Sequence, residues 1–225
     1  DLEFFMETRP AGVPYIMEEF VNAQVNSYDA IIDGEGNPIF EAGNVTVNSV
    51  MDVVNDKQES IFYIVKDLAE DVRAAGRATV KSFGVKNRFV HLEFFRLLED
   101  NEALGKAGDV IGLEVNMRPS GGLTPDMINF ARNTNVYKIW ADMMTYGSSL
   151  YPVGEHSFCV FAGRWDAKRY KLDHFALLSK YGSNMKMVER VPGSLADAMG
   201  EMMYMACFAT LEQLDEFYKD IMDCQ

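Results

Sequence analysis

The sequence predicts a domain of mixed class, α+β or α/β, in which strands and helices alternate along the chain. Two observations predict this class. Short apolar and β-branched runs, bounded by turn-forming residues, alternate with longer segments whose apolar residues recur at helical spacing. The chain also has 225 residues, of which 48% are hydrophobic and 24% charged, and a chain of this length and composition buries a core without disulfide bonds.

The first elements follow from turn and strand signals. Residues 1–12 contain Arg-Pro and Ala-Gly pairs, so we expect a tail or linker there. A short apolar strand is predicted at residues 15–17. A hairpin is predicted from a strand at 28–33, a glycine-containing turn at 34–37 and a return strand at 38–42.

The middle of the chain contains a predicted helix and a second hairpin. Residues 44–56 are polar and predict a loop. Residues 57–83 have apolar side chains at helical spacing and predict one long helix that ends at Gly84. Strands are predicted at 88–97 and 110–117, joined by a long polar connection, and they form an antiparallel pair.

The last hundred residues continue the mixed pattern. Thr124 and Pro125 predict the N-cap and first turn of a helical region that extends to about residue 146. The basic residues in 164–171 predict a turn, which is either solvated or in contact with a substrate carboxylate. The other predicted elements are strands at 158–163 and 185–191 and helices at 195–205 and 211–222.

Charge and cysteine content exclude some partners. Lys and Arg number 21 against 34 Asp and Glu, and the net charge of −13 disfavours general attraction to nucleic acid or anionic membranes. We therefore expect no nucleic-acid partner, and no apolar run is long enough to predict a membrane span. The three cysteines include no Cys-x-x-Cys pair, so we expect a reducing, cytoplasmic location.

Polar side chains cluster on the second predicted hairpin. If Glu93 stands opposite Glu114, both share one face of the sheet with His91, Asn116 and Arg118. The register is an assumption, because the long connection leaves it free. Opposed carboxylates are tolerated when a proton or cation lies between them. Two carboxylates and an amide oxygen suit Mg²⁺ whose other positions are filled by phosphate oxygens, and an arginine could reach a phosphoryl group.

A second interpretation of this cluster is open. Glu93 and Glu114 could be ordinary surface glutamates that pair with Arg96 or Lys106. The small residues at 119–122 favour the ligand site, because they let a ligand approach the backbone closely.

These residues carry a resemblance to a known family. The segments HLEFF at 91–95 and GLEVNMRPSGG at 112–122 resemble the ATP-grasp superfamily, which includes carbamoyl phosphate synthase, biotin carboxylase and amino-acid ligases. Residues 15–21 resemble the hinge strand of that family, and 33–37 resemble the hairpin that follows it. The resemblance implies the ATP-grasp fold, whose larger C-terminal lobe has an antiparallel sheet flanked by helices.

The resemblance also implies a division of the chain. Residues 13–150 would form the C-terminal ATP-grasp lobe with the floor of the Mg-ATP site, and 151–225 would be a C-terminal elaboration packed on the same unit. Only about a dozen residues precede the hinge, with Arg9 as their single cation. We therefore expect a C-terminal part of a longer protein that is inactive alone and needs the N-terminal lobes of the same protein as partners.

The resemblance assigns roles to the clustered side chains. Glu93, Glu114 and Asn116 would bind Mg²⁺ or Mn²⁺ that bridges the phosphates of ATP, and Arg118 would stabilise the acyl-phosphate transition state. Asp29 fits a Ser-x-Asp strand of the family through Ser27, and its role is open.

The hinge would hold the adenine. Glu18 would accept a hydrogen bond from the adenine amino group, and the main chain at Glu19 and Val21 would contact the ring edge. Phe20, in the same nucleotide-binding segment, either packs in the core or stacks on the adenine. The ribose-binding residue is not identified by the sequence.

The implied activity of the whole protein is that of an ATP-dependent, ADP-forming carboxylate–amine ligase with small-molecule carboxylate and amine substrates. A bicarbonate-activating enzyme like carbamoyl phosphate synthase or a carboxylase, and a non-catalytic nucleotide-binding module, are the alternatives. The sequence identifies neither the carboxylate nor the acceptor, and a homodimer is an open alternative to a monomer.

Overall fold

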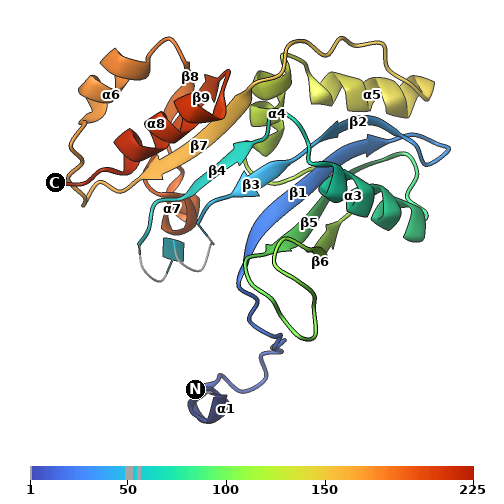
Figure 1. Ribbon diagram of the computed structural model, residues 1–225, viewed down its shortest axis with the longest axis horizontal. Coiled ribbons are helices and arrows are strands. Elements are labelled where there is room, and N and C mark those ends of the chain that lie inside the picture. Colours follow the sequence, from blue (N-terminus) through green and yellow to red (C-terminus); the bar gives the residue numbers. More distant parts are fainter. Residues whose placement is uncertain (1, 49–52, 55–56) are drawn as a thin grey trace.

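The computed structural model describes residues 2–48, 53–54 and 57–225. Its strands form one nine-stranded sheet (Figure 1). They are β1 Ala23–Ile32, β2 Pro38–Ala42, β3 Asn44–Thr46, β4 Ile61–Ile64, β5 Arg88–Leu97, β6 Val110–Asn116, β7 Phe158–Arg164, β8 Met185–Arg190 and β9 Met202–Phe208. The order is β6-β5-β1-β3-β4-β7-β9-β8, and β2 pairs with the second half of β1. The strand pairings of the described chain are all antiparallel, which confirms the predicted mixed class with an antiparallel sheet.

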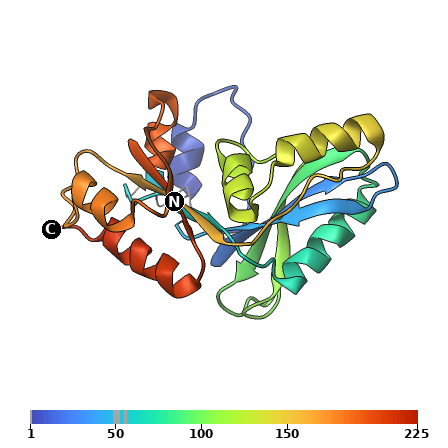
Figure 2. The ribbon, with the colours of Figure 1, turned by 90° about the horizontal axis from the view of Figure 1, so that it is seen from above.

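Helices cover both faces of this sheet (Figure 2). The helices whose bounds the structure gives are α1 Leu2–Thr8, α3 Glu70–Ser82, α4 Thr124–Arg132, α5 Val136–Tyr146, α6 His174–Tyr181, α7 Gly193–Met199 and α8 Leu211–Met222, and all except α1 lie on the sheet. One face packs on α4, α5 and α7, and the other packs on α3, α6 and α8. None of the helices in the described ranges has the length and apolar content needed to cross a bilayer.

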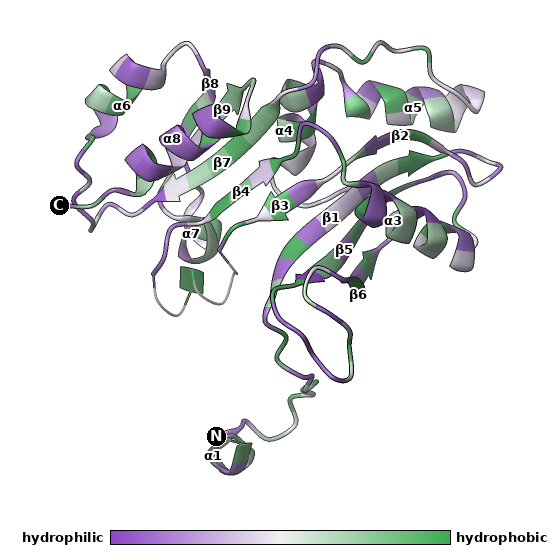
Figure 3. Ribbon diagram, in the orientation of Figure 1, coloured by the Kyte–Doolittle hydropathy of each residue, from purple (hydrophilic) through white to green (hydrophobic). Residues whose placement is uncertain are grey.

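The central strand β1 is buried on both faces. Ala30 and Ile32 pack toward α3, whereas Ile31 packs toward α4 and α5, so its side chains alternate between two cores. Figure 3 shows the same hydrophobic character along β4 and β7 in the middle of the sheet. On the α4 side, the polar residues Ser27 and Asp29 continue the face that begins with Ile31.

Several predicted bounds are confirmed. The strands at 38–42 and 88–97 and the helix at 211–222 have the predicted ends. The hairpin turn at 34–37 also forms, with the amide of Gly36 donating to the carbonyl of Asp33 at 3.2 Å. Thr124 is the first residue of α4 and not its N-cap, which is Leu123.

The N-terminal predictions are partly wrong. A tail or linker is predicted at residues 1–12, but residues 2–8 form helix α1. This helix has no buried residue and lies apart from the sheet (Figure 1). Residues 15–17 form no strand, because this extended segment pairs with no other strand in the described chain. The predicted loop at 44–56 contains strand β3, and its residues 49–52 and 55–56 lie outside the described residues.

Two helix predictions extend into strands. The segment predicted as one helix at 57–83 is strand β4 followed by α3, because Ile61 and Ile64 insert between β3 and β7 as buried strand residues. The helix predicted at 195–205 ends at Met199, and β9 begins at Met202. Gly200 separates the two with φ of +78°, a conformation that favours glycine. Helix α6 has no counterpart among the predicted elements.

Arg164, the first residue of the predicted basic turn, is buried and not solvated. Arg164 is only 4% exposed, and its guanidinium donates to the carbonyl oxygens of Ile221 at 2.8 Å, Asp220 at 3.2 Å and Leu172 at 2.8 Å. Two of these carbonyls belong to the last turn of α8, whose acceptors have no partner within the helix. Arg164 therefore caps α8 from inside the protein.

Candidate functional site

The register of β5 and β6 agrees with the prediction. Glu93 lies directly opposite Glu114, and His91 lies opposite Asn116. Side chains at opposed positions of an antiparallel pair project to the same face, so these four side chains share one face of the sheet. The register shifts by one residue just beyond Glu93, where Phe94 pairs with Gly112 and Leu113 is left without a partner.

A chain of buried polar groups leads to Glu93 from inside the sheet. The backbone N–H of Asn44 donates to Oγ of Ser27 at 2.9 Å, and the hydroxyl of Ser27 donates to Oδ2 of Asp29 at 2.5 Å. Nδ1 of His91 lies 2.8 Å from Oδ1 of Asp29, and its Nε2 lies 3.1 Å from Oε1 of Glu93. Asp29 is fully buried, so β1 supplies a carboxylate that the sequence left without a role.

The environment of His91 keeps its ring charged. Burial alone would lower the pKa of His91, but the charge and hydrogen bond of Asp29, together with Glu93, raise it to about 10. At neutral pH both ring nitrogens therefore carry protons, and each donates to one carboxylate. His91 thus links the buried Asp29 to Glu93 on the face that Glu93 shares with Glu114.

The ion pairs expected in the surface-glutamate interpretation do not form, although Glu114 is exposed. Arg96 pairs with Asp71 through two hydrogen bonds of 2.7 and 2.8 Å, and Lys106 pairs with Asp100 at 3.0 Å. Neither cation is available to Glu93 or Glu114. Glu114 forms no hydrogen bond or ion pair with any residue of the ranges 2–48, 53–54 and 57–225.

The donor set fits a hard divalent cation. Glu93 and Glu114 lie opposite each other, neither forms an ion pair with a Lys or Arg of the described chain, and Asn116 lies on the same face. The described chain contains no cluster of three or more His, Cys, Asp and Glu side chains that could hold a metal ion. The protein therefore offers at most two carboxylates and one amide, and the remaining positions of a metal would need oxygens from a ligand.

Arg118 lies just beyond β6. Its guanidinium is exposed and donates to the carbonyl oxygen of Pro119 at 2.9 Å. The chain then passes through the glycines of 121–122 into α4. Arg118 has no carboxylate partner among the residues described, so it can turn toward an anion at the sheet surface without breaking an ion pair.

The predicted hinge lies beside the end of β5. Phe20 is 77% exposed, so its predicted core packing is wrong. Phe20, Val21 and Asn22 line a small hollow of about 180 Å³ together with Leu97, Glu99 and Asn101. Oε1 of Glu19 accepts a hydrogen bond from Asn101 at 3.2 Å, and Glu18 is exposed. Leu97 and Glu93 are four residues apart on β5, which places the hollow about 13 Å along the strand from the carboxylate pair.

The chain resembles known proteins in its structure and not in its sequence. No protein-family model matches the sequence, and no curated protein matches it. Solved structures do match. Phosphoribosylglycinamide synthetase from Anaerococcus prevotii is 12% identical with a TM-score of 0.58, and the match covers 92% of this chain and 54% of that one.

Two other solved structures are similar over nearly the same residues. L-amino acid ligase from Bacillus licheniformis is 13% identical with a TM-score of 0.63, covering 90% of this chain and 51% of that one. The biotin carboxylase domain of 2-oxoglutarate carboxylase from Hydrogenobacter thermophilus, solved with MgADP and bicarbonate, is 13% identical with a TM-score of 0.57, covering 92% and 47%. The chain thus spans about half the length of each of these solved proteins. The motifs, the sheet and these likenesses agree that this chain has the ATP-grasp fold.

Proposed function

We propose that this chain forms the nucleotide- and metal-binding floor of an ATP-dependent, ADP-forming carboxylate–amine ligase. The observation that carries the proposal is the pairing of Glu93 with Glu114 and of His91 with Asn116 on an ATP-grasp fold. Because the chain spans about half of the similar solved proteins, the complete enzyme would need further lobes of the same protein to cover this floor.

Each side chain of the face has a proposed task. Glu93, Glu114 and Asn116 would hold Mg²⁺ or Mn²⁺ together with the phosphates of ATP. The metal, when bound, would neutralise phosphate charge and polarise the transferred phosphoryl group. His91 and Asp29 would hold Glu93 in its ligating orientation, because the chain of hydrogen bonds fixes both strands.

The hinge would bind the base. The hollow beside Phe20 and Val21 suits the edge of a planar ring, and the exposed ring of Phe20 can stack on it. Glu18 would accept a hydrogen bond from the adenine amino group, and the main chain at Glu19 and Val21 would contact the ring edge. We also propose that residues 151–225 belong to the same unit as 13–150, because β7, β8 and β9 extend the same sheet.

The proposed reaction has two steps. A carboxylate oxygen attacks the γ-phosphorus of ATP, which gives an acyl phosphate and ADP, and an amine then attacks the acyl carbon and displaces phosphate. Arg118 would stabilise the charge that develops on the phosphoryl oxygens and later on the acyl oxygen. The contribution of this chain is positioning and electrostatic stabilisation.

Bicarbonate activation is the second candidate function. It is favoured by the likeness to a biotin carboxylase domain that was solved with bicarbonate. Bicarbonate would take the place of the carboxylate in the first step and form carboxyphosphate. A non-catalytic module would bind the nucleotide and release no phosphate with either class of substrate.

Binding of Mn²⁺ with ADP to the isotope-labelled chain tests the proposed floor. We expect paramagnetic broadening centred on β5 and β6, and E114Q and E93Q should each weaken binding about tenfold or more. The control is E189Q on β8, an exposed glutamate at the far end of the sheet, which should bind as the unmodified chain does. Unchanged affinity in E114Q would show that the metal floor is wrongly assigned.

The proposed activity is tested with the complete enzyme. Phosphate release from ATP would be measured with pooled amino acids and, separately, with bicarbonate. Release that depends on amino acids supports the ligase, and release that depends on bicarbonate supports the second candidate. Nucleotide binding without release in either assay would support the non-catalytic module.

A further inference from the structure

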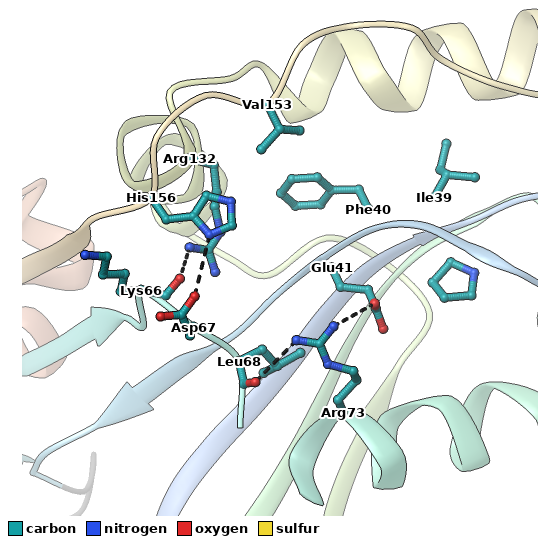
Figure 4. A pocket seen from close by; sticks show the side chains of 11 residues that line it. Ile39, Phe40, Glu41, Lys66, Asp67, Leu68, Arg73, Arg132, Val153 and His156 are labelled. Carbon is teal, nitrogen blue, oxygen red and sulfur yellow. Dashed lines mark hydrogen bonds and ion pairs between the residues drawn. The ribbon is translucent and has the colours of Figure 1, made fainter. Parts of the chain in front are cut away.

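A second pocket lies at the outer edge of β2 and shares no lining residue with the Glu93–Glu114 pair. It has a volume of about 260 Å³ and lies between α3 and the end of α4 (Figure 4). Arg73 and Arg132 contribute guanidinium groups, and Phe40 and Val153 form part of an apolar wall. No residue that we assign to the nucleotide or the metal lines this pocket.

Arg132 is a buried cation that forms no ion pair in the described part of the chain. It is only 2% exposed, and its guanidinium donates to the carbonyl oxygen of Lys66. Its Nε is buried and has no hydrogen-bond partner, and no carboxylate of the described chain forms an ion pair with it. Burial lowers the pKa of Arg132, but a guanidinium remains charged at neutral pH. A buried charge in this condition is costly unless an anion approaches it.

Arg73 adds a second incompletely satisfied guanidinium. It donates to the carbonyl of Leu68 at 3.3 Å and to Oε2 of Glu41 at 3.5 Å. Its Nε is buried without a hydrogen bond, although the exposed Glu70 carboxylate lies within ion-pair distance at 3.3 Å. Glu41 is mainly engaged elsewhere, because Arg77 donates to it at 2.9 and 2.6 Å.

The other acidic group at the pocket, Asp67, acts on Arg132 through its charge without forming an ion pair with it. The side chain of Asp67 is 84% exposed and lies 3.9 Å from Nδ1 of His156, which Figure 4 shows beside Arg132. Lys66 donates to the carbonyl of Ala209 and has no carboxylate partner in the described chain. The two guanidinium groups at the pocket are therefore only partly compensated, because Glu41 is shared with Arg77 and Asp67 is mainly exposed.

From these observations we propose that this pocket binds a small organic carboxylate. Its carboxylate group would lie against the guanidinium groups of Arg132 and Arg73, which line the pocket. Its short apolar body would contact Phe40, Ile39 and Val153. The site is separate from the proposed nucleotide floor, so it stands or fails independently of the proposed function.

Titration of the isotope-labelled chain with butanoate, without metal or nucleotide, tests this site. We expect shifts centred on Phe40, Val153 and His156 and a change in the side-chain N–H signals of Arg132 when the carboxylate binds against its guanidinium group. Butylammonium, which has the same apolar body and the opposite charge, should cause no shifts there. Inorganic phosphate is the third probe, because it shares the negative charge but lacks the apolar body.

Two variants make the test sharper. V153D places a negative charge at the pocket mouth on a side chain that is 46% exposed, so it should leave the fold intact and weaken butanoate binding about fivefold. The control V13D changes a valine that is 45% exposed in the N-terminal segment and should have no effect. No shifts with butanoate, equal shifts with butylammonium, or binding of phosphate alone would each overturn the proposal.

Discussion

Nδ1 of His91 on β5 lies 2.8 Å from Oδ1 of the fully buried Asp29 on β1, which is its direct cross-strand neighbour. This ion pair ties the central strand to the strand that carries Glu93. Removing one member of a buried pair leaves the other charge uncompensated.

We expect D29N to lower the free energy of unfolding by about 3 kcal/mol, measured by urea denaturation. The control D215N changes an exposed aspartate of α8 and should stay within about 0.5 kcal/mol of the unmodified chain. Equal stability of the two variants would contradict a charged pair inside the sheet.

The stability contributed by Glu41 should depend on pH. Burial alone would raise the pKa of Glu41, but hydrogen bonds from Arg77 and Tyr28 and the charges of Arg77 and Arg73 lower it below its usual value. A depressed carboxyl pKa stabilises the fold above the unfolded-state pKa of about 4.3, and this contribution is lost as pH falls through the lower, folded-state value.

We therefore expect E41Q to cost about 2 kcal/mol at pH 7, and this cost should shrink on acidification below about pH 4. Urea denaturation of E41Q and the unmodified chain across this range measures the difference. E189Q, at an exposed site, should show a small difference that does not change with pH. A cost for E41Q that grows on acidification would have the wrong sign.

The crossing of α7 over β7 depends on Gly163. A Cβ atom at Gly163 would lie 1.7 Å from the carbonyl oxygen of Met199, so the backbone of β7 or α7 would have to move. We expect G163A to lower the free energy of unfolding by about 3 kcal/mol, which is the upper end of the usual cost of overpacking. The control G112A adds the same methyl group on β6 where no atom lies within 4 Å, and thermal unfolding of the two should differ clearly.

Arg164 should hold the end of α8 in place. We expect R164M to lower the free energy of unfolding by about 3 kcal/mol, because three carbonyl groups lose a charged donor. Hydrogen exchange should become faster in the last turn of α8 and change little in α4. R169M removes another arginine of the same turn and should have little effect. Equal exchange in both variants would refute the capping role.

The carboxylate face could be predicted from the sequence because it depends on local alternation. Glu93 and His91 are two residues apart, as are Glu114 and Asn116, so each pair shares a strand face once the strands are assigned. The ends of β5 are marked by turn signals, and its predicted bounds are confirmed. Asp29 was identified only as a motif residue, because its contact with His91 needs the pairing of β1 with β5 across 62 positions.

The rest of the structure depends on contacts that sequence periodicity does not contain. Ile61 and Ile64 fit both a helix and a strand, and the pairing of β4 with β3 and β7 selects the strand. Arg132 lies in an apolar helical segment without any motif, and its role follows only from the approach of Lys66 and the edge of β2. A charged residue on an apolar helix face was the one signal that could have drawn attention to it.

The unpaired Leu113 determines which side chain of β6 lies opposite Glu93. From Phe95 opposite Ile111, an uninterrupted ladder would place Leu113, and not Glu114, opposite Glu93. If this bulge closed with every residue still present, Leu113 would take the place of Glu114 opposite Glu93, and an aliphatic group would replace an acid while the sheet remained intact. Deletion of Leu113, in contrast, would close the bulge and keep Glu114 opposite Glu93.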